Sequence, residues 1–149
     1  MASAEQMREV IVTAGRASAD IEGILEQASD EWLLRYPDID VAVEFDADGN
    51  RLVLSAELDQ PAPEDRLEVY ATLLNYSLLW RDTGGVYAAM TAGGTLTLLL
   101  PLFGDEVTAE LLAAVLENFK AKARILSICI AQPGEQQIAE TSTENTMNV

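Results

Sequence analysis

Acidic side chains are the most abundant source of chemistry in this sequence. Asp and Glu number 25 against 9 Lys and Arg, and the chain holds no histidine and a single cysteine. General acid–base catalysis, thiol chemistry and zinc binding therefore lack their commonest side chains. Cys129 stands in an apolar run and is expected to be a small buried hydrophobic residue. Ser55, Ser77 and Ser127 have no histidine to activate them, and Lys120 and Lys122 are expected on the exposed side of the last helix, so we expect no covalent catalysis.

Two groups of carboxylates could bind a cation or form an acid–base pair. Residues 46–50 place two aspartates before a glycine, but a calcium loop needs a bidentate glutamate at its twelfth position, and an apolar strand pattern follows here instead. A hairpin turn explains these residues better, because Asp and Gly adopt unusual backbone angles easily. No feature marks two members of the second group as a catalytic pair, and we expect it to be solvated: Asp38, Asp40, Glu57 and Asp59.

The sequence therefore predicts a binding protein with no catalytic residue, no metal and no cofactor. Its net charge of −16 argues against nucleic acid, whose phosphates need clustered Arg and Lys, and against an anionic membrane. The first residues lack the apolar run of a signal peptide, and no stretch approaches the about 20 apolar residues of a membrane span, so we expect a cytoplasmic protein. The length fits one domain over residues 1–131, and the polar residues 132–149 are expected to be a disordered tail.

The apolar pattern predicts helices packed on an antiparallel sheet. Residues 3–18 form an amphipathic helix, because their apolar members recur at three- and four-residue steps. Residues 19–29 allow two interpretations, a second helical piece or a segment that returns toward the sheet. Three strands then follow at 32–36, 39–45 and 51–58, separated by turn residues.

The second half of the chain predicts a helix, a hairpin and a last helix. Acidic residues at 64–65 begin a helix that ends near Trp80, and two strands at 86–91 and 95–100 form the hairpin. Asp105 is expected to cap the last helix. The predicted order is helix, three strands, helix, two strands, helix, which is an α+β fold with helices packed on an antiparallel sheet.

The predicted middle helix carries two apolar stripes, whereas a helix packed on one sheet needs only one. The first stripe consists of Leu67, Tyr70, Ala71, Leu74 and Leu78. The second stripe consists of Val69, Leu73, Tyr76 and Trp80. One explanation is a helix buried on all sides within a single core. The explanation that we favour is a symmetric homodimer whose interface is the second stripe.

Four runs of the sequence also carry a family resemblance. They are WLLRY at 32–36, RLVL at 51–54, LLNYSLLW at 73–80 followed by a glycine pair, and GTLTL at 94–98. Together with the order of the elements, these runs resemble the class I type III secretion chaperones, the Tir chaperone family, which hold bacterial effector proteins ready for export. The resemblance implies a homodimer built around the second helix and the neighbouring strand, which acts by binding alone and needs no nucleotide.

The resemblance further implies that the N-terminal segment of a secreted effector wraps around the dimer in extended form and stays soluble and locally unfolded. Apolar grooves would accept its side chains, and strand edges would accept its backbone hydrogen bonds. The candidate effector-binding residues are Met7, Val10, Ile11, Ala14, Leu33, Val41, Val43 and Leu54. Each of them could equally be a plain core residue. The ATPase of the secretion apparatus is a further implied partner, and the alternative function is a non-catalytic regulatory adaptor of similar α+β fold.

Overall fold

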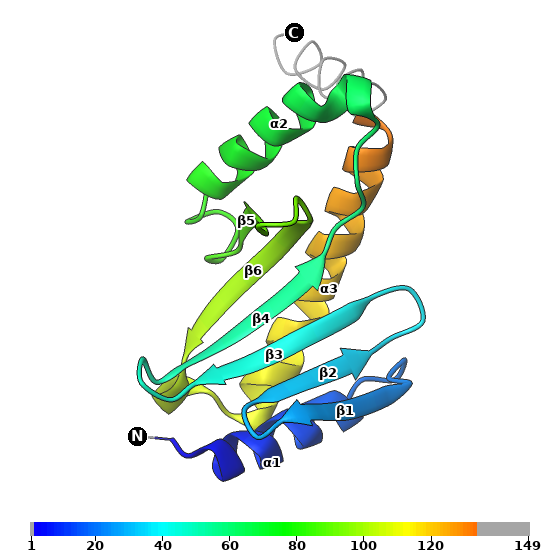
Figure 1. Ribbon diagram of the computed structural model, residues 1–149. Helices are drawn as coiled ribbons and strands as arrows, with labels where there is room; N and C mark the ends of the chain where they lie inside the picture. Colours follow the sequence, from blue (N-terminus) through cyan, green and yellow to red (C-terminus); the bar gives the residue numbers. More distant parts are fainter. Residues whose placement is uncertain (1, 134–149) are drawn as a thin grey trace, which may run out of the picture.

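A computed structural model describes residues 2–133 of the chain as three α-helices and six β-strands (Figure 1). Short 3₁₀ turns precede the second and third helices. The elements in chain order are α1 (Ala4–Arg16), β1 (Gly23–Ala28), β2 (Glu31–Arg35), β3 (Asp40–Asp46), β4 (Arg51–Glu57), α2 (Arg66–Leu78), β5 (Tyr87–Met90), β6 (Leu96–Phe103) and α3 (Ala109–Ala131).

All six strands form one antiparallel sheet in the order β1-β2-β3-β4-β6-β5. Its register aligns apolar side chains across four strands, with Trp32 opposite Val43, Val43 opposite Leu54 and Leu54 opposite Leu100. These four side chains are buried, because alternate residues of a strand point to one face. The intervening positions form the opposite face and are only partly buried, as at Leu33.

Helices α1 and α3 contact each other and supply apolar side chains to the same core, with α3 running behind the sheet (Figure 1). α1 begins at a capping box in which the Ser3 hydroxyl accepts a hydrogen bond from the Gln6 backbone N–H and the Gln6 side chain accepts one from the Ser3 N–H. The apolar stripe of α3 is buried along its length: Leu112, Leu116, Phe119, Ala123, Leu126 and Ile130. α2 packs against β5 instead and lies at one end of the sheet.

The predicted α+β class is confirmed, but the strand count before α2 was wrong. Four strands precede α2 where three were predicted, because the ambiguous residues 19–29 contain β1. β1 pairs with β2 on one side only and is mostly exposed, so it lacks the alternation that marks the other strands. Thr108, and not Asp105, caps α3, since its hydroxyl accepts a hydrogen bond from the Leu111 backbone N–H. The predicted tail lies outside the described residues from residue 134 onward.

The acidic run at 46–50 is a hairpin turn between β3 and β4. The Asp46 carboxylate accepts hydrogen bonds from the Gly49 backbone N–H at 3.1 Å and from Arg51 at 3.0 Å, and these bonds hold the pKa of Asp46 below its usual value. Asn50 has a φ of 48°, a backbone conformation that Asn tolerates better than most residues. The turn therefore has a structural role, as the sequence indicated.

Candidate functional site

The outer face of α2 is the most apolar exposed helix surface among the described residues. Leu67, Leu74 and Leu78 are 86%, 71% and 75% exposed. Leu79 and Trp80 at the end of the helix and Met90 of β5 are also exposed. We call these six residues the leucine face. Contiguous apolar surface of this kind usually marks an interface, because leaving it in water is unfavourable.

An apolar pocket of about 230 Å³ lies between α2 and β5 beside the leucine face. Its lining residues are Tyr70, Leu73, Leu74, Ala88, Ala89, Met90 and Leu96. Ser77 fixes the spacing between the helix and the strand, since its hydroxyl accepts a hydrogen bond from the Ala88 N–H at 2.9 Å and donates to the Leu73 carbonyl at 2.9 Å. The pocket therefore has a fixed shape and is suited to receive an apolar side chain from outside the subunit.

The structure separates the four residues predicted at a dimer interface. Val69 and Leu73 are 3% and 5% exposed and pack into the core of their own subunit, and Tyr76 is partly buried against that core. Of the four, only Trp80 is exposed. The two predicted stripes of the helix both exist, but the outward one is that of Leu67, Leu74 and Leu78.

Most of the predicted effector-binding residues belong to the subunit core. Met7, Ile11, Ala14, Val41, Val43 and Leu54 are all buried there. Val10 is partly buried on α1, and Leu33 lies on the open face of the sheet. Of the eight residues, these last two have side chains that remain accessible to a partner. The other six act as the packed interior that positions them.

A groove of about 720 Å³ runs between α1 and the edge strand β1. We call it the α1–β1 groove, and its lining residues are Arg8, Glu9, Val12, Thr13, Arg16, Ile21, Glu22, Gly23, Ile24, Glu26 and Trp32. Trp32 is buried, and its indole N–H has no hydrogen-bond partner among the described residues. Because β1 ends the sheet, its outer edge also has backbone groups free to pair with another strand.

A second groove of about 860 Å³ lies where the ends of the central strands meet the C-terminal half of α3. We call it the sheet-end groove. Its acidic lining residues are Asp38, Asp40, Glu57 and Asp59, and its apolar ones include Leu33, Ile39, Ala42, Ala56, Ala123 and Ile128. Ser127 of α3 accepts a hydrogen bond from the Asp59 backbone N–H at 3.3 Å and so holds the chain that leaves β4 against the helix. The predicted solvated carboxylates are thus gathered along one groove.

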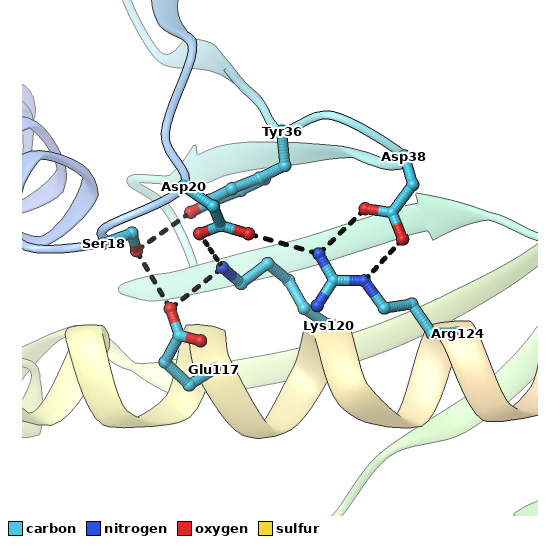
Figure 2. Close-up of polar contacts among 7 residues, drawn as sticks. All are labelled: Ser18, Asp20, Tyr36, Asp38, Glu117, Lys120 and Arg124. Atoms are coloured by element: carbon cyan, nitrogen blue, oxygen red, sulfur yellow. Dashed lines mark hydrogen bonds and ion pairs between the residues drawn. The ribbon is translucent and has the colours of Figure 1, made fainter.

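A polar cluster beside this groove ties α3 to two loops (Figure 2). Lys120 is fully buried, and its ammonium group contacts the carboxylates of Asp20 at 3.0 Å and Glu117 at 2.9 Å. The ammonium also lies 3.7 Å from the centre of the Tyr36 ring, a favourable cation–π contact. A buried charge is tolerated when it is paired in this way.

Arg124 forms the second half of the polar cluster and borders the sheet-end groove (Figure 2). Its guanidinium donates two hydrogen bonds to Asp38, at 2.8 and 2.9 Å, and contacts Asp20 at 3.4 Å. The Arg124 guanidinium holds the pKa of Asp38 below its usual value, and the hydrogen bond from Lys120 does the same for Asp20. Burial works to lower the pKa of Lys120, but its carboxylate partners outweigh burial and the pKa is raised.

Neither a cluster of candidate metal ligands nor a membrane-spanning helix occurs among the described residues. Within residues 2–133, no group of three or more His, Cys, Asp or Glu side chains is placed to hold a metal ion. Over the same residues, no helix combines the length and the hydropathy that crossing a bilayer requires. The same residues do present two grooves, an open strand edge and an exposed apolar helix face, an arrangement suited to binding other chains.

Comparison with known families agrees with this architecture. The sequence matches the model of the Tir chaperone protein (CesT) family over residues 21–127, which is more than half of its 149 residues. The chain belongs to the Tir chaperone family. The matched range includes the whole sheet, α2 and most of α3, so the fold of this Tir chaperone family member rests on the elements that the family shares.

Two solved structures are similar to this Tir chaperone family member in fold. A chain in the crystal structure of the ExsC–ExsE complex has a TM-score of 0.67 and 16% identity, and the match covers 88% of this chain and 98% of that one. A chain in the HopA1–SchA chaperone–effector complex has a TM-score of 0.64 and 12% identity, and the match covers 81% and 92%. No curated protein sequence gives a significant match.

Lys120 is the residue of the polar cluster whose position we predicted wrongly, because we expected it on the exposed side of the last helix. The signal was present in the sequence. Lys120 follows Leu116 by four residues and precedes Ala123 by three, so it lies on the buried stripe of α3. Glu117 precedes Lys120 by three residues on α3, a spacing at which helical side chains meet, whereas Asp20 comes from the loop after α1 and no sequence pattern joins that loop to α3.

The ion pairs of the polar cluster predict a specific loss of stability in acid. Asp20 and Asp38 have lowered pKa values in the fold, so their contribution is present above the pKa of the unfolded chain and is lost as pH falls through the folded pKa. Lys120 has a raised pKa, so its contribution persists through neutral pH and disappears only in strong alkali. The unfolding temperature should therefore be lower at pH 3 than at pH 7.

The variant Asp38→Asn isolates this effect from the general titration of an acidic protein. It should unfold at a lower temperature than the native chain at pH 7, and the difference should shrink as the pH falls below about 4 and the Asp38 carboxylate becomes protonated, as measured by circular dichroism. Asp48→Asn is the matched control, since Asp48 is exposed and takes part in no ion pair among the described residues. If the difference in unfolding temperature between Asp38→Asn and the native chain were the same at pH 3 as at pH 7, the stabilising role of the Asp38 ion pair would be contradicted.

Proposed function

We propose that this member of the Tir chaperone family is a dimeric type III secretion chaperone of the bacterial cytoplasm. It binds the N-terminal region of a secreted effector and keeps that region soluble, locally unfolded and competent for export. It works by binding and without catalysis. The observation that carries the proposal is the leucine face of α2, an exposed apolar surface on a chain of this family.

The dimer forms through the leucine face in this proposal. An isologous contact would place α2 of one subunit against α2 and β5 of the other, so that a leucine of each could enter the apolar pocket of its partner. Trp80 and Tyr76, which the sequence predicted at the dimer interface, lie in this contact or at its edge in the proposal. Val69 and Leu73 support it from within the subunit.

The effector segment docks in the α1–β1 groove in this proposal. An extended chain beside β1 would add a strand to the sheet, and its backbone would pair with the free edge. A carbonyl oxygen of that chain could also accept the unpartnered Trp32 indole N–H. Val10 and Leu33, the accessible members of the predicted set, are not among the lining residues of this groove, and Leu33 lines the sheet-end groove instead. The complex between HopA1 and the chaperone SchA supports effector binding as the activity of this fold.

Coexpression with the products of neighbouring genes tests this function. We expect one such product to be soluble only when this chain is present, to copurify with it, and to be secreted in its presence. Val12→Asp combined with Thr13→Asp, two lining positions of α1 that are not buried, should abolish copurification. Phe103→Asp, at an exposed apolar position away from α2 and β1, should retain it. A copurified partner that is never secreted would favour the regulatory adaptor instead.

A second partner of the proposed chaperone is the ATPase of the secretion apparatus. Binding of the loaded chaperone by the purified ATPase, measured by surface plasmon resonance, tests this contact. Equal binding of an unrelated acidic protein would contradict a specific interaction.

A further inference from the structure

The sheet-end groove carries negative charge that the subunit does not neutralise. Glu57 and Asp59 both line it, and neither forms an ion pair with any cation of residues 2–133. Asp40 has only a long contact of 3.7 Å with Arg35. Arg124 is the only cation among the lining residues, and its guanidinium is already engaged by two aspartates. The groove is therefore electrostatically complementary to a cationic group from outside.

The groove also offers an apolar floor and an unused hydroxyl. Leu33 and Ala42 from the sheet and Ile128 from α3 line it together with smaller side chains. Thr97 of β6 lines it as well, and its buried hydroxyl has no hydrogen-bond partner among the described residues. A groove that combines apolar contacts, a hydroxyl without a hydrogen-bond partner and an acidic border fits a peptide better than a free ion, because a peptide offers groups that match all three.

The chain's own C-terminal residues are a poor occupant of this groove. Gln132, just before the end of the described residues, lies in its lining, and residues 134–149 follow in the sequence. Those residues contain three glutamates and no lysine or arginine. Like charges repel, so this segment would be disfavoured beside Glu57 and Asp59.

We propose that the sheet-end groove receives an extended segment of a client protein that carries Arg or Lys at alternate positions beside small apolar residues. Glu57 and Asp59 are two residues apart, a distance of about 6.6 Å in an extended chain. Alternate residues of an extended client have the same spacing, and their side chains point to one face of the client. This inference rests on the proposed function, because it names the chemistry of the segment that a client must present. It adds a site separate from the α1–β1 groove and from the leucine face.

Labelled peptides test this preference directly. The probes are three fluorescein-labelled peptides of about 12 residues, roughly 40 Å when extended, that share an alternating Ser and Val frame. They carry two Arg, two Gln or two Glu at alternate central positions, and a fourth probe is the segment 134–149. Fluorescence anisotropy with the full chain should give the tightest binding for the Arg peptide, and added salt should weaken that binding.

Glu57→Gln combined with Asp59→Asn should weaken the Arg peptide by about tenfold and leave the Gln peptide unchanged. Asp48→Asn combined with Glu64→Gln removes the same charge from exposed positions outside the groove and should have little effect. The inference is overturned if the Arg and Gln peptides bind equally or if the Arg peptide does not bind at all. It is also overturned if both double variants lose the same affinity for the Arg peptide, or if the segment 134–149 binds more tightly than the Arg peptide. If the chain selects the Arg peptide but binds no secreted client, the proposed function is contradicted and the peptide site in the sheet-end groove is still supported.

Discussion

A chain carrying Leu74→Glu and Leu78→Glu is expected to be a monomer at micromolar concentration, where we expect the native chain to be a dimer. Both leucines are largely exposed in the subunit, so their burial contributes to association and not to the fold. Burying one leucine stabilises by about 1.5–3 kcal/mol, and a twofold contact contains each leucine twice. Four glutamates in place of these leucines should weaken the dimer by roughly 1000-fold or more. Multi-angle light scattering measures the change.

Two variants separate a lost interface from a lost fold. Phe103→Glu introduces the same charge at an exposed apolar position on β6, at the opposite end of the molecule from α2, and should remain a dimer (Figure 1). Leu73→Glu buries a carboxylate in the core and should unfold α2 and β5, which circular dichroism would detect. A native chain that is already monomeric at micromolar concentration would remove the main support for the dimer.

Replacing Lys120 by alanine is expected to lower the free energy of unfolding by about 2–4 kcal/mol. The substitution removes a fully buried aliphatic stem and leaves a cavity beside the Tyr36 ring. It also removes the cation that Asp20 and Glu117 share, although water partly compensates because both carboxylates are partly exposed. Urea denaturation followed by circular dichroism provides the measurement.

Lys120→Met distinguishes the two contributions, because methionine fills most of the same volume without the charge. We expect it to cost about 1–2 kcal/mol, between the native chain and Lys120→Ala. Arg66→Ala is the matched control, since Arg66 is exposed and forms no ion pair among residues 2–133, and it should change stability by less than about 0.5 kcal/mol. Similar losses for Lys120→Ala and Arg66→Ala would show that the polar cluster does not stabilise the fold.

Periodicity predicted every regular element that buries a full stripe or face. α3 was recognisable because its apolar residues recur at helical spacing, and β3 because its apolar residues alternate with polar ones. β1 was not predicted as a strand, because an edge strand buries little surface and its apolar residues therefore do not alternate with polar ones. Its strand conformation comes from hydrogen bonds to β2, which depend on a neighbour and not on its own side chains.

The candidate sites were predicted less completely than the fold. Sequence patterns identified apolar residues on α1, β2 and β3, but they could not tell which of them are buried: Ile11 and Val43 belong to the core, whereas Leu33 lies on an open face. We grouped the four carboxylates of the sheet-end groove from the sequence but expected only a solvated surface. The groove itself could not be anticipated, because its acidic residues come from the start of β3 and the end of β4 and converge only through strand register.

The sequence by itself determined that this chain is an acidic α+β binding protein with a doubly apolar helix, and its local runs identified the family. These properties follow from the composition and from the spacing of residues that are close in the sequence, and both can be read without a structure. Only the tertiary structure decided which stripe of α2 faces water. Helical spacing fixes the two stripes relative to each other, but β5 and the core bury Val69 and Leu73 and so leave Leu74 and Leu78 for a partner.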